Sequence, residues 1–532
     1  AVYHDGLGDQ DRKLVEDLYS NGVVRVVVAS HDMAWGMPMR SSVVVIAGLM
    51  VADTHRHTTA DVPVPDVLQM MGMATDPGNS ALGKCFIFCH IHKKDFYKKF
   101  VFEPLPLESH LDHFLHDTMN SEIVSKTITN KQDAVDYLTW TFLYRRLPRN
   151  PNYYNLTGTS HRHLSDALSE MVETTLEDLE NSRCINVEDD IDVSPLNLGM
   201  IASYYYVRYT TIELYGSSIQ NNTKARGLLE ILSSASEYDD QEIPVREKEE
   251  RLLEQLHKHV RFSVPNPKYT SASTKSNLLL QAYFGRMRVP LELKDDQRRI
   301  VTNAHRLLQA MVDVISSNGW LGPALAAIEI AQMCTQAMWD DDSPLLQLPH
   351  VSKELSQRFR SQGVDSVFDL LELDDEKRVE MLSMNESQLA EVAAACNSFP
   401  SIEVSFDVED EDDVTAGDPV TIVVSLERED DEENDADIDT RAIAPHFPGE
   451  KEVGWWLIVG DVKRGVLLCI KRVGTLRKKK AVTKLMFNAP SEVSKHDLTL
   501  YLMCDAYLGA DQEFEFNIDV KEGEDESEDD EN

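Results

Sequence analysis

The sequence Val26-Val27-Val28-Ala29-Ser30, followed by the loop that reaches Trp35-Gly36, opens the stretch that decides how the first part of this 532-residue chain folds. Similar β-branched runs return at Ser42–Ala47 and Lys84–His90, and a periodic helix pattern precedes them at Asp11–Ser20. Short apolar runs that alternate with helices are typical of a buried parallel sheet. Only the later strands of such a sheet are present, so the pattern predicts exposed apolar surface or a covering partner.

The rest of the chain changes its periodicity twice. A short strand at Cys184–Val187 among helices predicts a small helical domain with a β-wing, and helix then follows helix from Leu196 to about Trp339. From Ser401 the apolar period becomes two, which indicates strands and predicts an immunoglobulin-like β-sandwich. The fold class is therefore multidomain α+β. The seven candidate strands are Ile402–Val408, Val420–Leu426, Trp455–Val459, Val466–Arg472, Thr483–Phe487, Leu498–Cys504 and Glu513–Val520.

Several helix boundaries follow from apolar stripes and stop signals. In residues 345–398 we expect two short helices joined through Gln362-Gly363-Val364, and then a third. The other predicted features are periodic helices at Lys131–Arg145 and Ser165–Asn181, a stripe from Leu198 to Ile212 closed by Gly216, a stripe from Ala304 to Ile315 ended by Asn318-Gly319, and a helix that begins near Pro323.

The formal net charge of −39 excludes general attraction to a phosphate backbone. The acidic residues gather in Glu409–Asp413, Glu427–Asp439 and Glu522–Glu531, and we interpret these runs as solvated loops or tails, with docking of a basic partner as the alternative. No apolar run is long enough to predict a membrane span. The seven scattered cysteines fit reduced thiols, and no pairing among them predicts a zinc site.

Long runs of residues carry a resemblance to a known family. Taken in the order in which they occur, these runs resemble the C-terminal helicase cassette of the spliceosomal Brr-two-type RNA helicases. The resemblance covers essentially the whole chain. The runs are Glu103-Pro104-Leu105-Pro106-Leu107-Glu108-Ser109-His110-Leu111, Lys131-Gln132-Asp133-Ala134-Val135-Asp136-Tyr137-Leu138-Thr139-Trp140-Thr141, Asn150-Pro151-Asn152-Tyr153-Tyr154, Pro195-Leu196-Asn197-Leu198-Gly199, Ser317-Asn318-Gly319-Trp320-Leu321 and Glu452-Val453-Gly454-Trp455-Trp456.

The resemblance implies a succession of domains that fits the segments described above. The final elements of the chain form a Sec sixty-three homology unit in that family. The implied domains are a partial second RecA-like helicase domain at 1–104, a winged helix at 105–193, a Sec-type helical bundle at 194–344, a helix-loop-helix at 345–399, the immunoglobulin-like sandwich at 400–521 and a disordered acidic tail at 522–532. The chain opens inside the first of these, so we expect a fragment of a longer protein.

Two stretches resemble degenerate helicase motifs. Val26–Ser30 with Trp35 and Gly36 resembles the fifth motif, which couples RNA contact to the nucleotide site in the family. The stretch that begins at Gln69 and contains Gly72 resembles the sixth, whose family pattern is Gln-x-x-Gly-Arg-x-Gly-Arg. Met73 and Asp76 occupy the two arginine positions, so the charge that stabilises phosphoryl transfer is missing. We expect no catalytic residue and no cofactor in this chain alone, whereas the full-length family uses ATP and magnesium.

Other motifs have simpler explanations. Gly78–Lys84 has the spacing of a phosphate-binding loop, but it leads towards a strand and Cys85 replaces the magnesium-binding hydroxyl. We interpret His110, His113 and His116, and the pairs His55/His57 and His161/His163, as solvated side chains rather than a metal site. We interpret several cations as ordinary surface charge. The alternatives are RNA contact at Arg286 and Arg306, and protein docking at the basic run Arg477–Lys480. These cations are Arg286, Arg288, Arg298, Arg299, Arg306 and the run Arg477–Lys480.

Two functions remain open at the level of sequence. In the first, the chain is a non-catalytic platform that acts in pre-mRNA splicing in the nucleus. It would bind splicing proteins and regulate an active N-terminal cassette of the same protein, with small nuclear RNA reached through the full-length protein. In the second, it is half of an ATP-dependent RNA-unwinding enzyme whose bundle guides single-stranded RNA. Sibling helicases of transcription coactivation or meiosis, and the membrane translocation protein that names the homology unit, are further alternatives.

Overall fold

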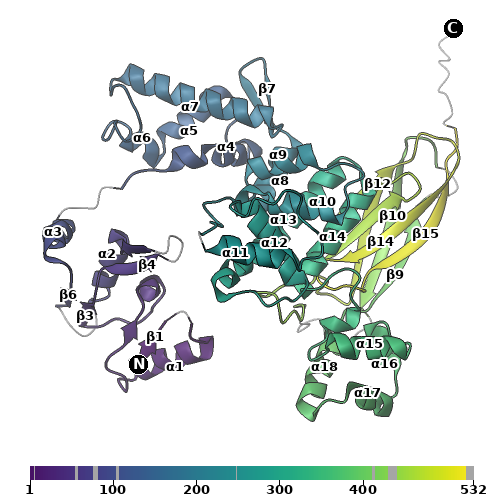
Figure 1. The fold of residues 1–532 in the computed structure, drawn as a ribbon. Helices are drawn as coiled ribbons and strands as arrows, with labels where there is room; N and C mark the ends of the chain where they lie inside the picture. Colours follow the sequence, from purple (N-terminus) through teal and green to yellow (C-terminus); the bar gives the residue numbers. More distant parts are fainter. Residues whose placement is uncertain are drawn as a thin grey trace, which may run out of the picture. The chain divides into compact units, whose positions relative to one another are not determined.

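The computed structural model describes residues 1–4, 6–53, 58–75, 82–102, 107–246, 248–409, 414–428 and 440–522. The chain forms two compact units, Ala1–Glu108 and Ser109–Asn532 (Figure 1). The acidic tail beyond residue 522, most of the other two acidic runs and residues 103–106 lie outside the described residues. No helix among the described residues is long and apolar enough to cross a membrane.

The first unit contains short elements in three two-stranded sheets. The strand pairs β1–β2 and β3–β6 are parallel, and β4–β5 is an antiparallel hairpin that the sequence did not predict. The elements are β1 (Val2–Tyr3), α1 (Asp9–Ser20), β2 (Val28–Ala29), η1 (His31–Trp35), β3 (Val43–Ile46), β4 (Met50–Asp53), β5 (Thr58–Asp61), α2 (Val64–Gly72), β6 (Lys84–Ile87), η2 (Ile91–Lys93) and α3 (Lys94–Phe102).

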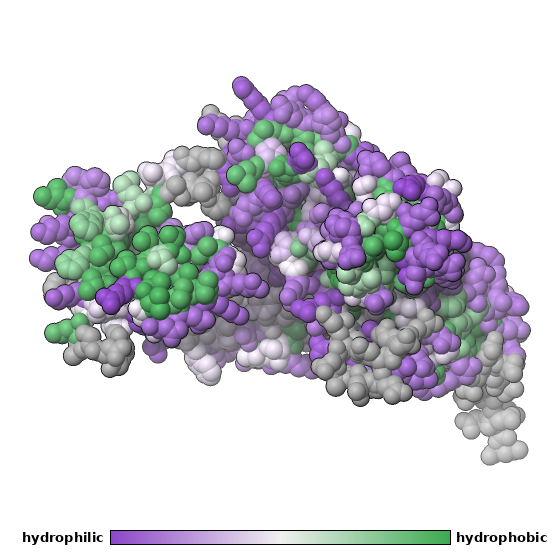
Figure 2. All heavy atoms as spheres, turned by 90° about the horizontal axis from the view of Figure 1, so that it is seen from below, coloured by the Kyte–Doolittle hydropathy of each residue, from purple (hydrophilic) through white to green (hydrophobic). Residues whose placement is uncertain are grey.

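The apolar core of the first unit is small, and this corrects the expectation of one buried sheet. Its fully buried members are Ile46, Leu49, Val62, Val67 and Tyr97. The run that opened the sequence forms only the two-residue strand β2, which pairs with β1, and most of its valines are exposed. The predicted exposure of apolar surface is therefore confirmed. Figure 2 shows apolar atoms gathered over this unit, at the left.

The second unit begins with a helical domain that carries a β-wing. Asn130 and Ser160 cap α5 and α7, because their side chains accept hydrogen bonds from the backbone N–H of Asp133 and His163. The single helix expected at Lys131–Arg145 is wrong, since it divides at Trp140-Thr141. The elements are η3 (Leu111–Phe114), α4 (Leu115–Val124), α5 (Lys131–Thr139), α6 (Phe142–Arg146), α7 (His161–Asn181), β7 (Ile185–Glu188) and β8 (Asp192–Pro195).

A helical bundle follows, and it shares one apolar core with part of the sandwich. The stripe predicted as one helix is two, because Tyr206 adopts a left-handed backbone with φ of 57° that ends α8, and Gly216 lies inside α9. The predicted end of the long helix at Asn318-Gly319 is confirmed, since Gly319 has φ of 69°. The elements are α8 (Asn197–Tyr205), α9 (Tyr209–Ser218), α10 (Ala225–Ser233), η4 (Ser236–Tyr238), α11 (Glu249–His257), α12 (Ala272–Phe284), α13 (Leu291–Ser317), α14 (Leu321–Gln336) and η5 (Pro344–Gln347).

Four short helices stand where the sequence predicted three. The additional boundary lies at Leu373, which has an extended backbone and separates two acidic segments. Reciprocal hydrogen bonds of Ser366 with Asp369, and of Asn385 with Gln388, start two of these helices as capping boxes. The helices are α15 (Lys353–Ser361), α16 (Val367–Glu372), α17 (Asp375–Leu382) and α18 (Glu386–Ser398).

The chain ends in a two-sheet antiparallel sandwich, so all seven predicted strands are confirmed. One sheet has the order β13-β10-β9 and the other has the order β12-β11-β14-β15 (Figure 1). Their facing side chains share a core with α15–α18. The immunoglobulin-like name stays a prediction. The strands are β9 (Ile402–Val408), β10 (Pro419–Arg428), β11 (Trp455–Asp461), β12 (Val466–Gly474), β13 (Lys480–Asn488), β14 (Lys495–Cys504) and β15 (Gln512–Asp519).

Candidate functional site

The two degenerate motifs meet in the first unit, where α2 packs against η1. The Trp35 Nε1–H donates a hydrogen bond of 2.8 Å to Asp66 Oδ1, and Gln69 Nε2 donates one of 3.3 Å to the carbonyl oxygen of Ala34. Gly36 ends η1, and the Ser30 N–H donates to the carbonyl oxygen of Tyr3. The structure therefore brings together the residues that the sequence singled out more than thirty positions apart.

The position of the first missing arginine is closed to solvent. Met73 directly follows Gly72, the last residue of α2, and it is only 5% exposed, with its carbonyl oxygen accepting a hydrogen bond from the Ser41 N–H. The described stretch 58–75 contains no lysine, arginine or histidine. Asp76, at the second arginine position, lies outside the described residues. Within the described residues, this stretch therefore offers an apolar thioether and no cation to a phosphoryl group.

The phosphate-loop spacing also lacks its required context. Residues 78–81 lie outside the described residues, but Lys84 begins strand β6 rather than a helix. A phosphate-binding loop needs the N–H groups at the start of a helix. The interpretation of Gly78–Lys84 as a chance match is consistent with this placement.

Most of these histidines are exposed, in agreement with their interpretation as solvated side chains, and several also have local partners. His116 Nε2 lies 2.9 Å from Asp178 Oδ2 and its ring stacks on Tyr209, whereas His110 stacks on His113. His163 Nδ1 lies 2.7 Å from the Ser160 hydroxyl. His55 and His57 lie outside the described residues. No group of three or more metal-ligating side chains occurs in the part of the chain that the structure describes.

Arg286 is an internal tie, which corrects its reading as surface charge. Its guanidinium donates to the carbonyl oxygens of Ala337, Gln336 and Leu346 at 2.8–3.1 Å, and burial lowers its pKa. Arg306 is half-buried and donates to the carbonyl oxygen of Tyr206 at 3.1 Å. Arg306 keeps part of its surface exposed. The basic run Arg477–Lys480 follows β12 and reaches the first residue of β13; these two strands belong to different sheets, so the run is not the tip of a β-hairpin.

A charged junction between the bundle and the sandwich was missed by sequence reasoning. Asp505 accepts hydrogen bonds from Lys451 Nζ at 2.8 Å and the Gly454 N–H at 2.7 Å, and it lies 3.6 Å from His305 Nε2. Burial alone would raise the pKa of Asp505, but the contact with His305 and the charge of Lys451 outweigh burial and hold it well below its usual range. These partners are up to 200 positions apart in the sequence, so no local sequence pattern predicts their contact.

A second buried network balances its own charges inside the bundle. Lys275 Nζ lies 2.6 Å from both Glu249 Oε2 and Asp296 Oδ2, and Arg246 Nη1 reaches the same two carboxylates at 2.5 and 2.8 Å. Burial alone would raise the pKa of Asp296, but hydrogen bonds from Lys275 and Arg246 lower it. Two cations thus face two carboxylates in a neutral cluster that ties three parts of the bundle. We assign it to structure because it has no nucleophile or open face.

Comparison with known proteins agrees with this architecture. A family model described as the Sec63 Brl domain matches residues 195–517, and one described as a winged helix-turn-helix domain matches residues 108–189. The chain is 53% identical over 527 residues to the "U5 small nuclear ribonucleoprotein 200 kDa helicase" of Homo sapiens, which covers 99% of this chain and 24% of that protein.

Two further relatives differ in their printed names. The chain is 52% identical over 526 residues to the "DExH-box ATP-dependent RNA helicase DExH12" of Arabidopsis thaliana, with 97% of this chain and 24% of that protein covered. It is 49% identical over 530 residues to the "Activating signal cointegrator 1 complex subunit 3-like" protein of Dictyostelium discoideum, with 97% and 23% covered. The chain thus spans about a quarter of the length of the curated relatives it matches, 24% in the human case. It belongs to the Sec63 Brl domain family and is similar, over nearly its whole length, to the C-terminal region of the 200 kDa helicases of the U5 small nuclear ribonucleoprotein.

Proposed function

We propose that this chain is a non-catalytic protein-interaction and regulatory platform that acts in pre-mRNA splicing in the nucleus. It binds splicing proteins and modulates an active helicase cassette in the N-terminal part of the same full-length protein. Its relatives named as U5 helicase subunits support the splicing context. ATP and magnesium belong, in this proposal, to the other cassette.

One observation carries the non-catalytic part of the proposal. Met73 stands where the family pattern has an arginine, and its side chain is buried beneath the end of α2. An arginine at a phosphoryl-transfer site contributes several orders of magnitude to the rate, because it stabilises the charge of the transition state. A buried methionine supplies no such charge and is closed to a substrate.

The platform part of the proposal rests on what is intact. The bundle, the short helices and the sandwich form one compact unit with continuous cores, and ion pairs such as Lys451–Asp505 tie its elements together. A rigid body of this kind keeps its surface preformed, which reduces the entropy lost on binding. A large pre-organised body in the same chain as a degenerate motif pair fits a role in binding better than a role in catalysis.

A quantitative pull-down tests the proposal. The chain, tagged and immobilised, is incubated with nuclear extract in the presence and absence of ATP, and bound proteins are identified by mass spectrometry. We expect several splicing proteins to be recovered in equal amounts with and without ATP, relative to an equally acidic control protein. Recovery of no splicing protein above that control would contradict the proposal.

The second candidate function is that the chain forms half of an ATP-dependent RNA-unwinding enzyme. Arg306 and the exposed cations Arg298 and Arg299 on α13 favour it. If this helix guides single-stranded RNA, replacing Arg306 with glutamate should reduce RNA-stimulated ATP turnover by the full-length protein. Under the platform proposal the same substitution leaves the turnover unchanged.

A further inference from the structure

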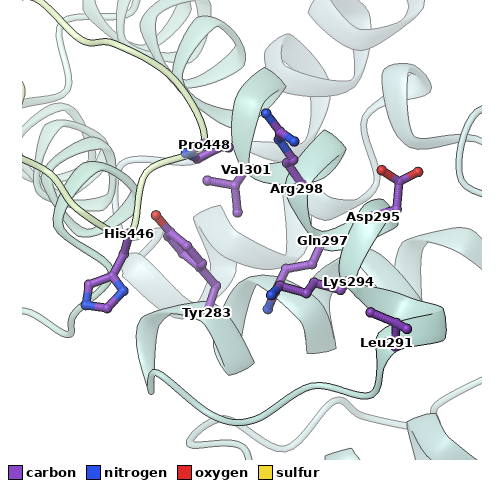
Figure 3. A pocket seen from close by; sticks show the side chains of 9 residues that line it. All are labelled: Tyr283, Leu291, Lys294, Asp295, Gln297, Arg298, Val301, His446 and Pro448. Atoms are coloured by element: carbon purple, nitrogen blue, oxygen red, sulfur yellow. The ribbon is translucent and has the colours of Figure 1, made fainter. Parts of the chain in front are cut away.

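A hollow of about 430 Å3 lies where the helical bundle meets the connection between β10 and β11 of the sandwich. Figure 3 shows the side chains that line it, which come from α12, from the first turns of α13 and from the segment around His446. Its volume lies within the range of pockets that receive ligands or several side chains of a peptide. Neither the degenerate motifs nor the charged junction at Asp505 contributes to its lining.

The walls of the hollow are mostly apolar. Val301, Pro448 and the ring of Tyr283 line it, and Leu291 stands at its edge with 83% of its surface exposed. The Tyr283 hydroxyl is buried and has no hydrogen-bond partner among the described residues. Burial raises the pKa of Tyr283, so its hydroxyl remains a donor in this apolar wall. An exposed leucine and a buried donor without a partner, both at the lining of one hollow, favour its occupation by a partner.

The rim of the hollow is positively charged. Lys294 and Arg298 are exposed and lie four residues apart on α13, so they share one helical face. Within the described parts of the chain neither forms an ion pair, whereas Asp295 beside them lies 3.5 Å from Arg299. Burial and, secondarily, Arg286 lower the pKa of His446 on the opposite wall. Two uncompensated cations in a chain of net charge −39 mark a local site for carboxylates.

We propose that this hollow binds a segment of a partner protein in which an apolar side chain is flanked by aspartate or glutamate. The apolar side chain fills the space against Leu291, Val301 and Pro448, and the carboxylates lie over Lys294 and Arg298. The inference rests on the proposed function as a protein-interaction platform, and it specifies one binding site and the chemistry of its occupant.

The acidic peptide is favoured over two other occupants. RNA binding draws its affinity from many phosphate contacts, and two cations on a strongly acidic chain supply few of them. A second copy of the chain carries the same net charge of −39, so long-range repulsion opposes its approach. A short acidic and apolar segment needs only the two cations and the apolar walls that are present.

The probe for the test is a random dodecapeptide library displayed on phage and selected on the full chain. Selected peptides are then synthesised with a fluorophore, and their affinity is measured by fluorescence anisotropy. We expect them to combine acidic with large apolar residues. We expect the K294E/R298E variant to weaken their binding by at least about tenfold, and Leu291→Ser, which changes an exposed side chain, by about threefold. The control R251E/K268E reverses two exposed charges that do not line the hollow, and it should retain the wild-type affinity.

Three results would overturn the inference. The first is that selected peptides lack carboxylates or bind K294E/R298E as tightly as the wild-type chain. The second is that the same variant abolishes binding of a fluorescent uridine oligonucleotide, which would make the hollow an RNA site. The third is a wild-type dimer, seen by light scattering, that the variant dissociates.

The nuclear-extract pull-down separates failure of this inference from failure of the proposed function. If wild-type and K294E/R298E chains recover the same splicing proteins in the same amounts, the hollow is not the binding site and the platform stands. If the wild-type chain recovers none, the platform itself fails. The control variant R251E/K268E shows whether any loss is specific to the hollow.

Discussion

At the scale of single residues, burial and local charge decide what each side chain can do. Met73 is buried at a position where the family motif has an arginine. Arg286 donates its guanidinium hydrogen bonds to backbone carbonyl oxygens. The identity of Met73 could be read from the motif spacing. The burial of Arg286 could not, since its acceptors at Gln336, Ala337 and Leu346 are brought to it only by folding.

Glu329 on α14 makes stability depend on pH. Burial, and then the negative charges of Asp340, Asp511 and Glu513, raise its pKa to about 7 from an ordinary value of 4.5. Because the pKa of this carboxyl is higher in the folded than in the unfolded protein, protonated Glu329 stabilises the fold. This stabilisation is complete below the pKa of the unfolded state and is lost as pH rises through about 7. In urea unfolding at pH 8, Glu329→Gln should therefore be more stable than wild type by on the order of 2 kcal/mol. At pH 4.5 the two proteins should have the same stability. Parallel pH profiles for the two proteins would contradict this account.

Asp505 contacts His305 of the bundle and pairs with Lys451 in a buried junction. Asp505→Asn leaves the nearly buried Lys451 ammonium without its counter-charge, so we expect a loss of on the order of 3 kcal/mol in urea unfolding at pH 7. Asp497→Asn is the matched control, because Asp497 pairs with Lys463 in solvent and its removal should change little. Equal effects of the two substitutions would show that burial of the junction does not matter.

At the scale of elements, the sequence predicts types better than boundaries. Strong periodicity located α13 and all seven sandwich strands, because apolar side chains recur regularly along each of them and enter the cores. Breaks inside apolar stripes were missed at Trp140 and Tyr206, which are both exposed. The carbonyl oxygen of Tyr206 accepts a hydrogen bond from Arg306, which is 100 positions away. The hairpin β4–β5 was missed because neither strand alternates strongly. Such breaks depend on tertiary contacts that no short window contains.

The start of α8 packs too closely for any side chain at Gly199. A Cβ there would lie 2.2 Å from the carbonyl oxygen of Cys184 and 2.6 Å from Asn120 Oδ1. Gly199→Ala should therefore force the β-wing away from α8 and lower the thermal midpoint markedly, by the equivalent of about 2 kcal/mol or more. Gly322→Ala in α14 is the control, because no atom lies within 4 Å of its added Cβ, and there we expect no loss or a slight gain. Destabilisation by Gly322→Ala alone would refute this packing argument.

At the scale of the whole molecule, the two units differ in the size of their hydrophobic cores. The first unit buries few apolar residues and exposes many, whereas the second has three extensive cores. The sequence predicted this contrast, because the first unit contains only the later strands of a sheet. It could not predict the hollow beside α13, whose lining residues come from segments more than 140 positions apart.

Limited proteolysis should reveal this contrast directly. With few buried side chains to oppose local opening, the first unit should be cleaved within residues 1–108 while residues 109–409 remain intact. The sites are identified by mass spectrometry at short times and low protease. First cleavage within the bundle would contradict the account of the cores.

The most direct test of the central claim measures ATP turnover by the full-length protein. In the sample, the nucleotide site of the N-terminal cassette is disabled by substitution of its phosphate-binding lysine, and turnover is measured with and without RNA. A platform that lacks the arginine of its sixth motif predicts turnover no higher than that of a protein with both nucleotide sites disabled. RNA-stimulated turnover above that level would show that the cassette containing Met73 hydrolyses ATP, and would contradict the claim.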